Sequence, residues 1–363
     1  MLLQTFVKTF TFAPLVRIGR LGGRFVAVTI KDVAREARVS VASVSRALNG
    51  RSNVTEDTRE RILHVAERLR YVPHASARSL ITRRTHTIGA LLPDLHGEFF
   101  SELIRGIDLA ARARGLHLLV SSSHGDARAV AAASRAMQGR VDGMLVMSPH
   151  VDANYGPHDL PHNVPLVLIN APPTNAHHPT LNVDNFGGAH AMVRHLVGRG
   201  HRRIAMIAGP DHNFDAAERL RGYQQAMAKF APGQPIQVLP GDFTEESGYA
   251  AGKRLLAQKA HPQAVFAAND IMAVGCLFAL NEAGVRVPHD VALAGFDDIP
   301  IARFVTPPLT TVRARIADLG RNALENLALQ LETPDAEQNR TQTLGCEIIV
   351  RESCGVEPAG GQP

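Results

Sequence analysis

Apolar residues recur at helical spacing in two short, adjacent stretches near the N-terminal end. Residues 30–37 and residues 41–48 each place apolar side chains three or four positions apart, which predicts two short helices with one buried face each. Only residues 38–40 separate them, and Ser40 can cap the second helix by accepting a hydrogen bond from its first turn. This pattern indicates a helix-turn-helix, whose second helix enters the DNA major groove, although an ordinary helical hairpin has similar spacing.

A third predicted helix and a segment of small residues follow. Thr55 is a suitable N-cap, and residues 61–69 carry an apolar face. The three helices make a headpiece, residues 28–72, whose core is small for a domain that folds alone. In residues 73–85, small side chains would let two hinge helices approach closely, and Leu80 would then project as a wedge into a DNA base step. A plain interdomain linker is the alternative.

After residue 86 the pattern changes to alternating strands and helices. Helical patterns such as 100–114 and 185–200 separate apolar runs that are typical of buried parallel strands. These runs are 88–92, 116–120, 143–147, 166–169, 203–207, 264–267 and 291–294. The pattern predicts a doubly wound α/β architecture with two lobes, in which ligands bind beyond the carboxyl ends of strands. Polar residues at those ends are Asp94, Ser148, Asn170, Asn269, Asp270, Asp297 and Asp298.

The charge is distributed unevenly along the chain. Residues 1–85 contain sixteen Lys/Arg and six Asp/Glu, a balance of +10, whereas the remaining residues contain 23 and 28, a balance of −5. Cations clustered near a groove-reading helix supply the salt-sensitive part of DNA affinity. The basic end therefore supports the helix-turn-helix interpretation, although a solvated basic face is also possible.

Cysteine usage and hydropathy bear on the compartment. Cys276, Cys346 and Cys354 are odd in number and far apart, which fits a reducing cytoplasm better than a disulfide framework. No run of about eighteen apolar residues exists, so no membrane span is predicted. Residues 1–27 contain four cations and no acid, like a targeting peptide. Because a DNA-reading domain follows directly, we expect instead a disordered or adventitious extension and a mature chain beginning near Val28.

Common enzyme and metal signatures are missing from the sequence. It contains no GxxxxGK[ST], GxGxxG, HExxH or GxSxG stretch. His158, His162, His177 and His178 lie among prolines and asparagines, without the spacing that places metal ligands on a regular element. The sequence therefore predicts no enzyme, no cofactor and no bound metal.

The chain as a whole resembles the lactose-repressor/galactose-repressor family of bacterial transcription factors. Residues 29–49, TIKDVAREARVSVASVSRALN, are similar to that family's N-terminal signature, and residues 53–80 are similar to its third helix and hinge. Further matches follow in order through the core: NVPLVLIN, VDNFGGAHAMVRHLVGRGHRRIAMIAGP, ERLRGY, GDFTEESGYAAGKRLL, AANDIMAVGCLFALNEAGVRVPHDVALAGFDD and PPLTTVR. The resemblance covers about residues 28–355.

The resemblance implies a headpiece, a hinge helix and a two-lobed core like periplasmic sugar-binding proteins. Three crossovers would join the lobes of this effector-binding core, residues 86–358. We expect the N-lobe at about 86–185 and 313–335, and the C-lobe at about 186–312 and 336–358. The resemblance also implies a homodimer, because two headpieces read a pseudo-palindromic operator. The tail after residue 355 lacks leucine heptads, which favours a dimer over a tetramer.

The same resemblance assigns DNA contacts. The exposed start of the second helix offers Val41, Ala42 and Ser43, of which the first two can make only apolar contacts with bases. Arg46, one turn on, is the only long donor and suits a guanine's O6 and N7. Candidate phosphate contacts are Thr29, Ser40 and Asn49, and candidate minor-groove contacts are Ala77, Arg78 and Leu80. Arg38 stands where relatives often have Gly or Asn, at a cost of about 1 kcal/mol if its backbone is left-handed.

Effector contacts also follow from the resemblance. Arg219 matches an arginine that holds a ligand hydroxyl or carboxylate, Asp297 and Asn269 match positions that bind sugar hydroxyls, and Phe243 matches an aromatic residue on the ligand's face. Weaker or less certain candidates are Phe99, Phe100, Asp94, Ser148, Asn213 and Asp215. The alternative for the phenylalanines is ordinary core, and for Arg219 and Asp297 an interlobe ion pair. HGEFF replaces the Asn-Pro-Phe-Phe of many relatives.

These observations predict a cytoplasmic, sequence-specific DNA-binding transcriptional regulator, a repressor of carbohydrate-use genes. A neutral sugar between the lobes would control its affinity for operator DNA. A purine or nucleoside would also fit the aromatic residues, and a phosphosugar would need more cations. A transporter's solute-binding protein would share the core but would lack residues 28–80.

Overall fold

The computed structural model describes residues 28–48, 53–71, 84–124, 126–147, 149, 164–172, 178–258, 260–333 and 341–355. They divide into two compact units, a headpiece within residues 1–83 and a core within residues 84–363. Several predictions lie outside the described residues, namely those on residues 1–27, Asn49, Ser148 and the hinge residues Ala77, Arg78 and Leu80.

The headpiece consists of α1 (Ile30–Glu36), α2 (Val41–Leu48) and α3 (Glu56–Arg68). Their apolar faces meet in a small buried core of Val33, Ala34, Ala37, Val44, Ala47, Ile62, Val65 and Ala66. The two helices of the predicted helix-turn-helix are confirmed. The third helix starts directly after Thr55, the predicted N-cap residue, and its first turn contains the acidic Glu56 and Asp57, which favour a helix N-terminus.

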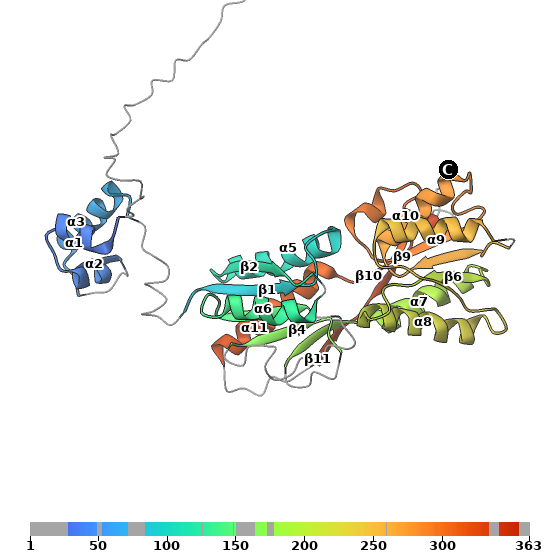
Figure 1. Ribbon diagram of the computed structural model, residues 1–363, viewed down its shortest axis with the longest axis horizontal. Helices are drawn as coiled ribbons and strands as arrows, with labels where there is room; N and C mark the ends of the chain where they lie inside the picture. Colours follow the sequence, from blue (N-terminus) through green and yellow to red (C-terminus); the bar gives the residue numbers. More distant parts are fainter. Residues whose placement is uncertain are drawn as a thin grey trace, which may run out of the picture. The chain divides into compact units, whose positions relative to one another are not determined.

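Each lobe of the core is built on a six-stranded sheet (Figure 1). The first sheet is entirely parallel, in the order β11-β5-β4-β3-β1-β2. Its strands are β1 (Thr87–Leu92), β2 (His117–Ser122), β3 (Gly143–Met147), β4 (Leu166–Ile169), β5 (Thr180–Val183) and β11 (Thr341–Leu344).

Helices cover both faces of the first sheet. On one face, α5 (Glu98–Ala113) and α11 (Ile316–Glu332) pack on alternate strand residues such as Leu145 and Ile169. On the other face, α6 (Ala127–Met137) packs on the intervening residues, such as Val146. Strands buried on both sides give the continuous apolar runs seen in the sequence.

The second sheet has the order β12-β10-β9-β8-β6-β7, in which only β12 is antiparallel to its neighbour. Its strands are β6 (Ile204–Ile207), β7 (Gln237–Leu239), β8 (Ala264–Ala267), β9 (Ala292–Asp297), β10 (Thr310–Arg313) and β12 (Glu347–Ile349). Its helices form two packed pairs, α7 (Asn185–Gly198) with α8 (Phe214–Phe230) and α9 (Glu245–Leu256) with α10 (Asp270–Glu282).

The chain passes between the lobes three times. The crossovers lie between β5 and α7, between β10 and α11, and between β11 and β12. The predicted assignment of residues 336–358 to the C-lobe was wrong in part, because β11 pairs in parallel with β5 of the first sheet. The third crossover therefore lies at residues 345–346, and the N-lobe includes residues 341–344.

Within the part of the chain that the structure describes, no helix is long and apolar enough to cross a membrane.

Candidate DNA-reading surface and effector cleft

The helix-turn-helix presents an exposed recognition helix. The Ser40 hydroxyl accepts a hydrogen bond from the backbone N–H of Ser43 at 3.0 Å, which is the predicted N-cap of α2. Val41, Ala42 and Arg46 are exposed on this helix, and Ser43 is half-buried. Among the described residues the Arg46 side chain has no hydrogen-bond or ion-pair partner, so its guanidinium is available to a base.

Other headpiece side chains have structural tasks. The Thr29 hydroxyl and backbone N–H both donate to the Asp32 carboxylate, at 2.7 and 3.0 Å, which caps α1 and lowers the pKa of Asp32. Arg59 donates to the Ala47 carbonyl at 3.1 Å and joins α3 to the end of α2. Thr29, proposed as a phosphate contact, therefore also caps the N-terminus of the first helix.

Arg38, in the turn of the helix-turn-helix, has a left-handed backbone with φ 53°. The sequence raised this conformation as a possibility, because relatives often have Gly or Asn there. An L-residue with a Cβ loses about 1 kcal/mol in this conformation.

The core contains a cleft of about 520 Å³ between its two lobes. It lies beyond the carboxyl ends of strands from both sheets, where ligands bind in doubly wound folds. Nine of the ten predicted effector residues line it: Asp94, Phe99, Phe100, Asn213, Asp215, Arg219, Phe243, Asn269 and Asp297. The volume is within the range of small-molecule sites.

Arg219, on α8, organises the buried floor of the cleft. Its guanidinium donates to the Asn185 side-chain oxygen at 2.8 Å and to the Ala268 carbonyl at 2.5 Å. It also lies 3.1 Å from an oxygen of Asp297 and stacks over the Phe296 ring at 3.8 Å. With a side chain only 4% exposed, Arg219 is a fixed positive centre rather than a mobile surface cation.

Asp215 connects the lobes through buried amides. Its two carboxylate oxygens accept hydrogen bonds from Asn170 of the first lobe and Asn185 at the start of α7, each at 2.8 Å. Burial raises the pKa of Asp215 to about 7, although Arg219 and the two amides lower it. Burial also raises the pKa of Asp297 to about 6, against the lowering effect of Arg219.

Backbone conformations that are unusual for side-chain-bearing residues occur at the cleft. Asp297 has φ 110° and Phe243 has φ 72°. Asn269 donates to the Phe243 carbonyl at 3.1 Å and accepts from the Met272 N–H at 2.9 Å as the N-cap of α10. The Asn269 contact holds Phe243 in a conformation that costs energy, and such strain is common at ligand sites.

Aromatic rings also come from the first lobe. Phe99 and Phe100, at the start of α5, form an edge-to-face pair with centroids 5.3 Å apart. Both are half-buried and line the cleft. Both lobes thus contribute rings and carboxylates to the cleft, which suit a ligand with apolar faces and hydroxyl edges.

Several lining residues were missed by the sequence reasoning. His96, Glu98, His124, Asp242 and Glu245 also line the cleft. Asp242 and Glu245 belong to the GDFTEE stretch, so their neighbour Phe243 could have indicated them. No sequence signal marked His124. Asn170 and Asn185 act beneath the lining, and only the three-dimensional contacts show their hydrogen bonds to Asp215.

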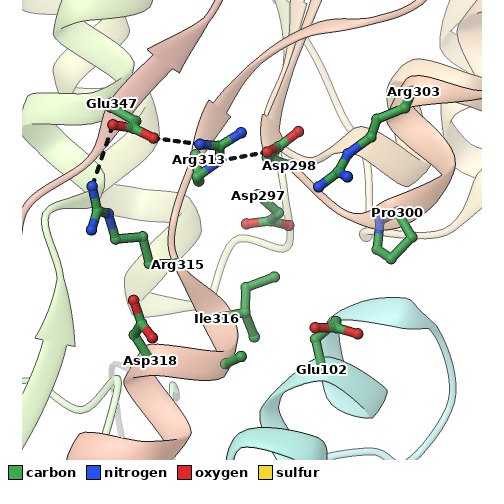
Figure 2. Close-up of a pocket in the computed structure, with 11 residues that line it drawn as sticks. Glu102, Asp297, Asp298, Pro300, Arg303, Arg313, Arg315, Ile316, Asp318 and Glu347 are labelled. Atoms are coloured by element: carbon green, nitrogen blue, oxygen red, sulfur yellow. Dashed lines mark hydrogen bonds and ion pairs between the residues drawn. The ribbon is translucent and has the colours of Figure 1, made fainter.

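Ion pairs cluster where the crossovers meet, around a second cavity of about 370 Å³ (Figure 2). Glu347, after the third crossover, pairs with Arg313 at 2.6 Å and with Arg315, at the second crossover, at 3.3 Å. Figure 2 also shows Glu102, from α5 of the first lobe, opposite Arg303 of the second lobe. The two pairs of Glu347 link the second and third crossovers, about which the lobes would rotate.

No metal centre is evident in the described part of the chain, where no group of three or more His, Cys, Asp or Glu side chains could hold an ion.

A helix-turn-helix headpiece together with a two-lobed, cleft-bearing α/β core defines a class of DNA-binding regulators that respond to small molecules. Comparison with family models agrees. Residues 29–74 match a model described as bacterial regulatory proteins, lacI family, and residues 193–354 match a periplasmic binding protein-like domain.

Similar proteins extend over almost the whole chain. The ribose operon repressor of Escherichia coli K12 is 36% identical over 318 residues, which cover 86% of this chain and 96% of that repressor. The HTH-type transcriptional repressor CytR of the same strain is 33% identical over 334 residues, 92% of this chain and 98% of CytR. The chain therefore belongs to the lacI family and is a DNA-binding transcriptional regulator.

Solved structures show the same architecture. The lac repressor dimer bound to operator and the anti-inducer ONPF has a TM-score of 0.81 and 30% identity, over 90% of this chain and 99% of that chain. A complex of the transcriptional regulator CelR with cellobiose has a TM-score of 0.66 and 32% identity over the same shares. A LacI family regulator from Enterococcus faecium with bound ribose has a TM-score of 0.66 and 25% identity, over 74% of this chain and 98% of that chain.

Proposed function

We propose that this regulator binds a pseudo-palindromic operator as a homodimer, represses carbohydrate-use genes and changes its operator affinity when a neutral sugar occupies the cleft between its lobes. The observation that supports the proposal most strongly is that nine residues expected from the family resemblance to contact an effector line one cleft. They come from both lobes, so a ligand that touches them all would favour one relative orientation of the lobes over another.

The charge of the cleft favours an uncharged ligand. Of the described residues, six carboxylate side chains line it, namely Asp94, Glu98, Asp215, Asp242, Glu245 and Asp297, against one guanidinium, that of Arg219. Arg219 is already paired with Asp297. A phosphate group would face like charges at close range without a free cation, which disfavours phosphosugars and nucleotides. Carboxylates instead accept hydrogen bonds from sugar hydroxyls.

Ribose is the first sugar to test, since one relative is a ribose operon repressor and one similar structure holds ribose. Cellobiose, held by another similar structure, is the second. Thermal unfolding with ribose, cellobiose and ribose 5-phosphate should show a concentration-dependent stabilisation by a neutral sugar and none by the phosphosugar. Stabilisation by the phosphosugar alone would contradict the proposed ligand class.

Coupling to DNA is tested separately. Duplexes selected from a random pool by the full chain supply an operator, and its affinity is measured with and without the stabilising sugar. A change in either direction supports allosteric control, because induction and corepression use the same parts. An unchanged affinity at saturating sugar would remove the sugar as an effector.

A further inference from the structure

Two arginines of the headpiece occupy backbone positions that glycine normally takes. At the end of α1 the Val39 N–H donates to the Ala34 carbonyl at 3.0 Å, and at the end of α3 the Tyr71 N–H donates to the Ala66 carbonyl at 2.8 Å. These are Schellman motifs, whose left-handed residue is usually glycine because it lacks a Cβ. Arg38 and Arg70 hold those positions here, with φ 53° and 51°.

The core of the same chain ends its helices differently. The equivalent backbone bond closes α5, α7 and α10, from Leu116 to Ala111, from His201 to Leu196 and from Val285 to Leu280. The left-handed residues there are Gly115, Gly200 and Gly284. The headpiece therefore has a left-handed arginine at the C-terminal end of two helices, where these three core helices have glycine.

The side chains of Arg38 and Arg70 have no polar interaction partner within the described part of the chain. Both are exposed, and neither makes a side-chain hydrogen bond or ion pair with a described residue. Two nearby cations differ in this respect, since Arg35 pairs with Asp32 and Arg68 pairs with Glu36, each at 2.5 Å. Like Arg46, the strained arginines therefore have no neutralising partner among the described residues.

The Glu36–Arg68 pair also places both arginines at one end of the headpiece. It joins the C-terminal ends of α1 and α3, and Arg38 and Arg70 follow its two members by two residues each. The recognition helix α2 begins at Val41, directly after the Arg38 turn. When the N-terminal part of a recognition helix enters the major groove, phosphates of both groove edges lie beside it.

We propose that Arg38 and Arg70, at one end of the headpiece, contact the DNA backbone beside the recognition helix, and that this contact offsets the cost of their strained conformation. This inference rests on the DNA-binding function proposed above and adds two residues to its DNA contacts. Such contacts act through charge, so they raise affinity for every sequence and make binding more sensitive to salt.

The test uses the full chain and a fluorescein-labelled duplex of about 30 base pairs of random sequence, in an anisotropy titration between about 50 and 200 mM KCl. Arg38→Gly and Arg70→Gly should each lower the slope of log affinity against log salt by about one per subunit. At about 0.1 M salt each should weaken binding roughly eightfold per subunit. Neither should lower the melting temperature of the headpiece, because glycine suits the left-handed position.

Two controls separate charge from conformation. Arg38→Lys keeps the charge and the strain, and should keep most of the salt slope. Arg254→Ala removes an exposed cation of the core that has no partner among the described residues, and should leave the slope unchanged.

Glycine variants whose salt slope equals that of the wild type would overturn the inference, as would an equal loss in Arg254→Ala. Failure of the wild-type chain to bind any duplex would instead contradict the proposed DNA-binding function itself, so the two failures are distinguishable.

Discussion

Replacing Arg219 by methionine should destabilise the core in a way that depends on pH. Methionine keeps much of the side-chain volume but removes the hydrogen bonds to Asn185 and Ala268 and the charge beside Asp297. Removing one partner of a buried pair leaves the other charge uncompensated, which costs about 3–5 kcal/mol. We expect a loss of that size at about pH 8, where Asp297 is ionised.

The sign of the pH dependence follows from the pKa of Asp297. Burial raises it from 3.8 to about 6 even with Arg219 in place, so the carboxyl group favours the folded state fully below pH 3.8 and loses this contribution as pH rises through 6. Arg219 lowers the pKa of Asp297 and also that of Asp215, so its removal raises both further. At about pH 5 both carboxyl groups are protonated in the variant, and the loss should fall to roughly half, the part due to hydrogen bonds.

Urea unfolding of wild type and Arg219→Met at both pH values measures these losses. Replacing Asp297 by asparagine puts a side chain there that is neutral at every pH. The double variant Arg219→Met/Asp297→Asn should therefore recover part of the loss at the higher pH and little at the lower one. An equal loss at both pH values, or no recovery in the double variant, would refute the reasoning that an unpaired buried carboxylate causes the instability.

Three further predictions concern the two binding surfaces. Arg46→Ala should weaken operator binding and reduce the preference for guanine over other bases at one operator position by about 1–3 kcal/mol, as measured with single-base operator variants. An undiminished base preference at every position would exclude Arg46 as a residue that contacts bases. Phe243→Ala should weaken sugar binding in calorimetry by about 1 kcal/mol while sparing DNA affinity without sugar, since its ring lies at the cleft. Asp215→Asn should flatten the rise in stability seen on acidification from about pH 8 to 6, because a group whose pKa is raised to about 7 stabilises the fold when protonated. The side-chain oxygen of Asn170 has no hydrogen-bond partner in the described part of the chain and can accept from the new amide after a flip, so this variant should fold. An unchanged pH profile would contradict the raised pKa of Asp215.

Local patterns allowed the sequence to predict the headpiece. The helix-turn-helix depends on apolar spacing within a few residues and on a cap at Ser40, and both are visible without knowledge of the rest of the fold. Likewise, polar residues that lie just beyond buried strands, such as Asn269 two residues after β8, must lie at the carboxyl edge of a sheet. The resemblance to a known family added Arg219 and Phe243, which lie on a helix and a loop.

Features that depend on distant partners could not be predicted in this way. Strand β11 is a short edge strand, TQTL, largely exposed and without an apolar run, so only its pairing with β5 shows that it belongs to the first lobe. The sequence marks Asn170 only as a polar residue at the end of a strand, and it does not mark Asn185 at all. Their role becomes visible only when folding brings both amides to Asp215, which lies on a different helix.

The central claim is that a sugar in the interlobe cleft controls DNA binding, and one measurement tests it directly. Operator affinity of the wild type and of Phe243→Ala is measured by anisotropy across a titration with the sugar that stabilises the core. We predict that the wild type changes affinity with a midpoint equal to its calorimetric dissociation constant, and that the variant shows the same change only at higher sugar concentration. A wild-type affinity that stays constant through saturation, or an unshifted midpoint in the variant, would contradict the account.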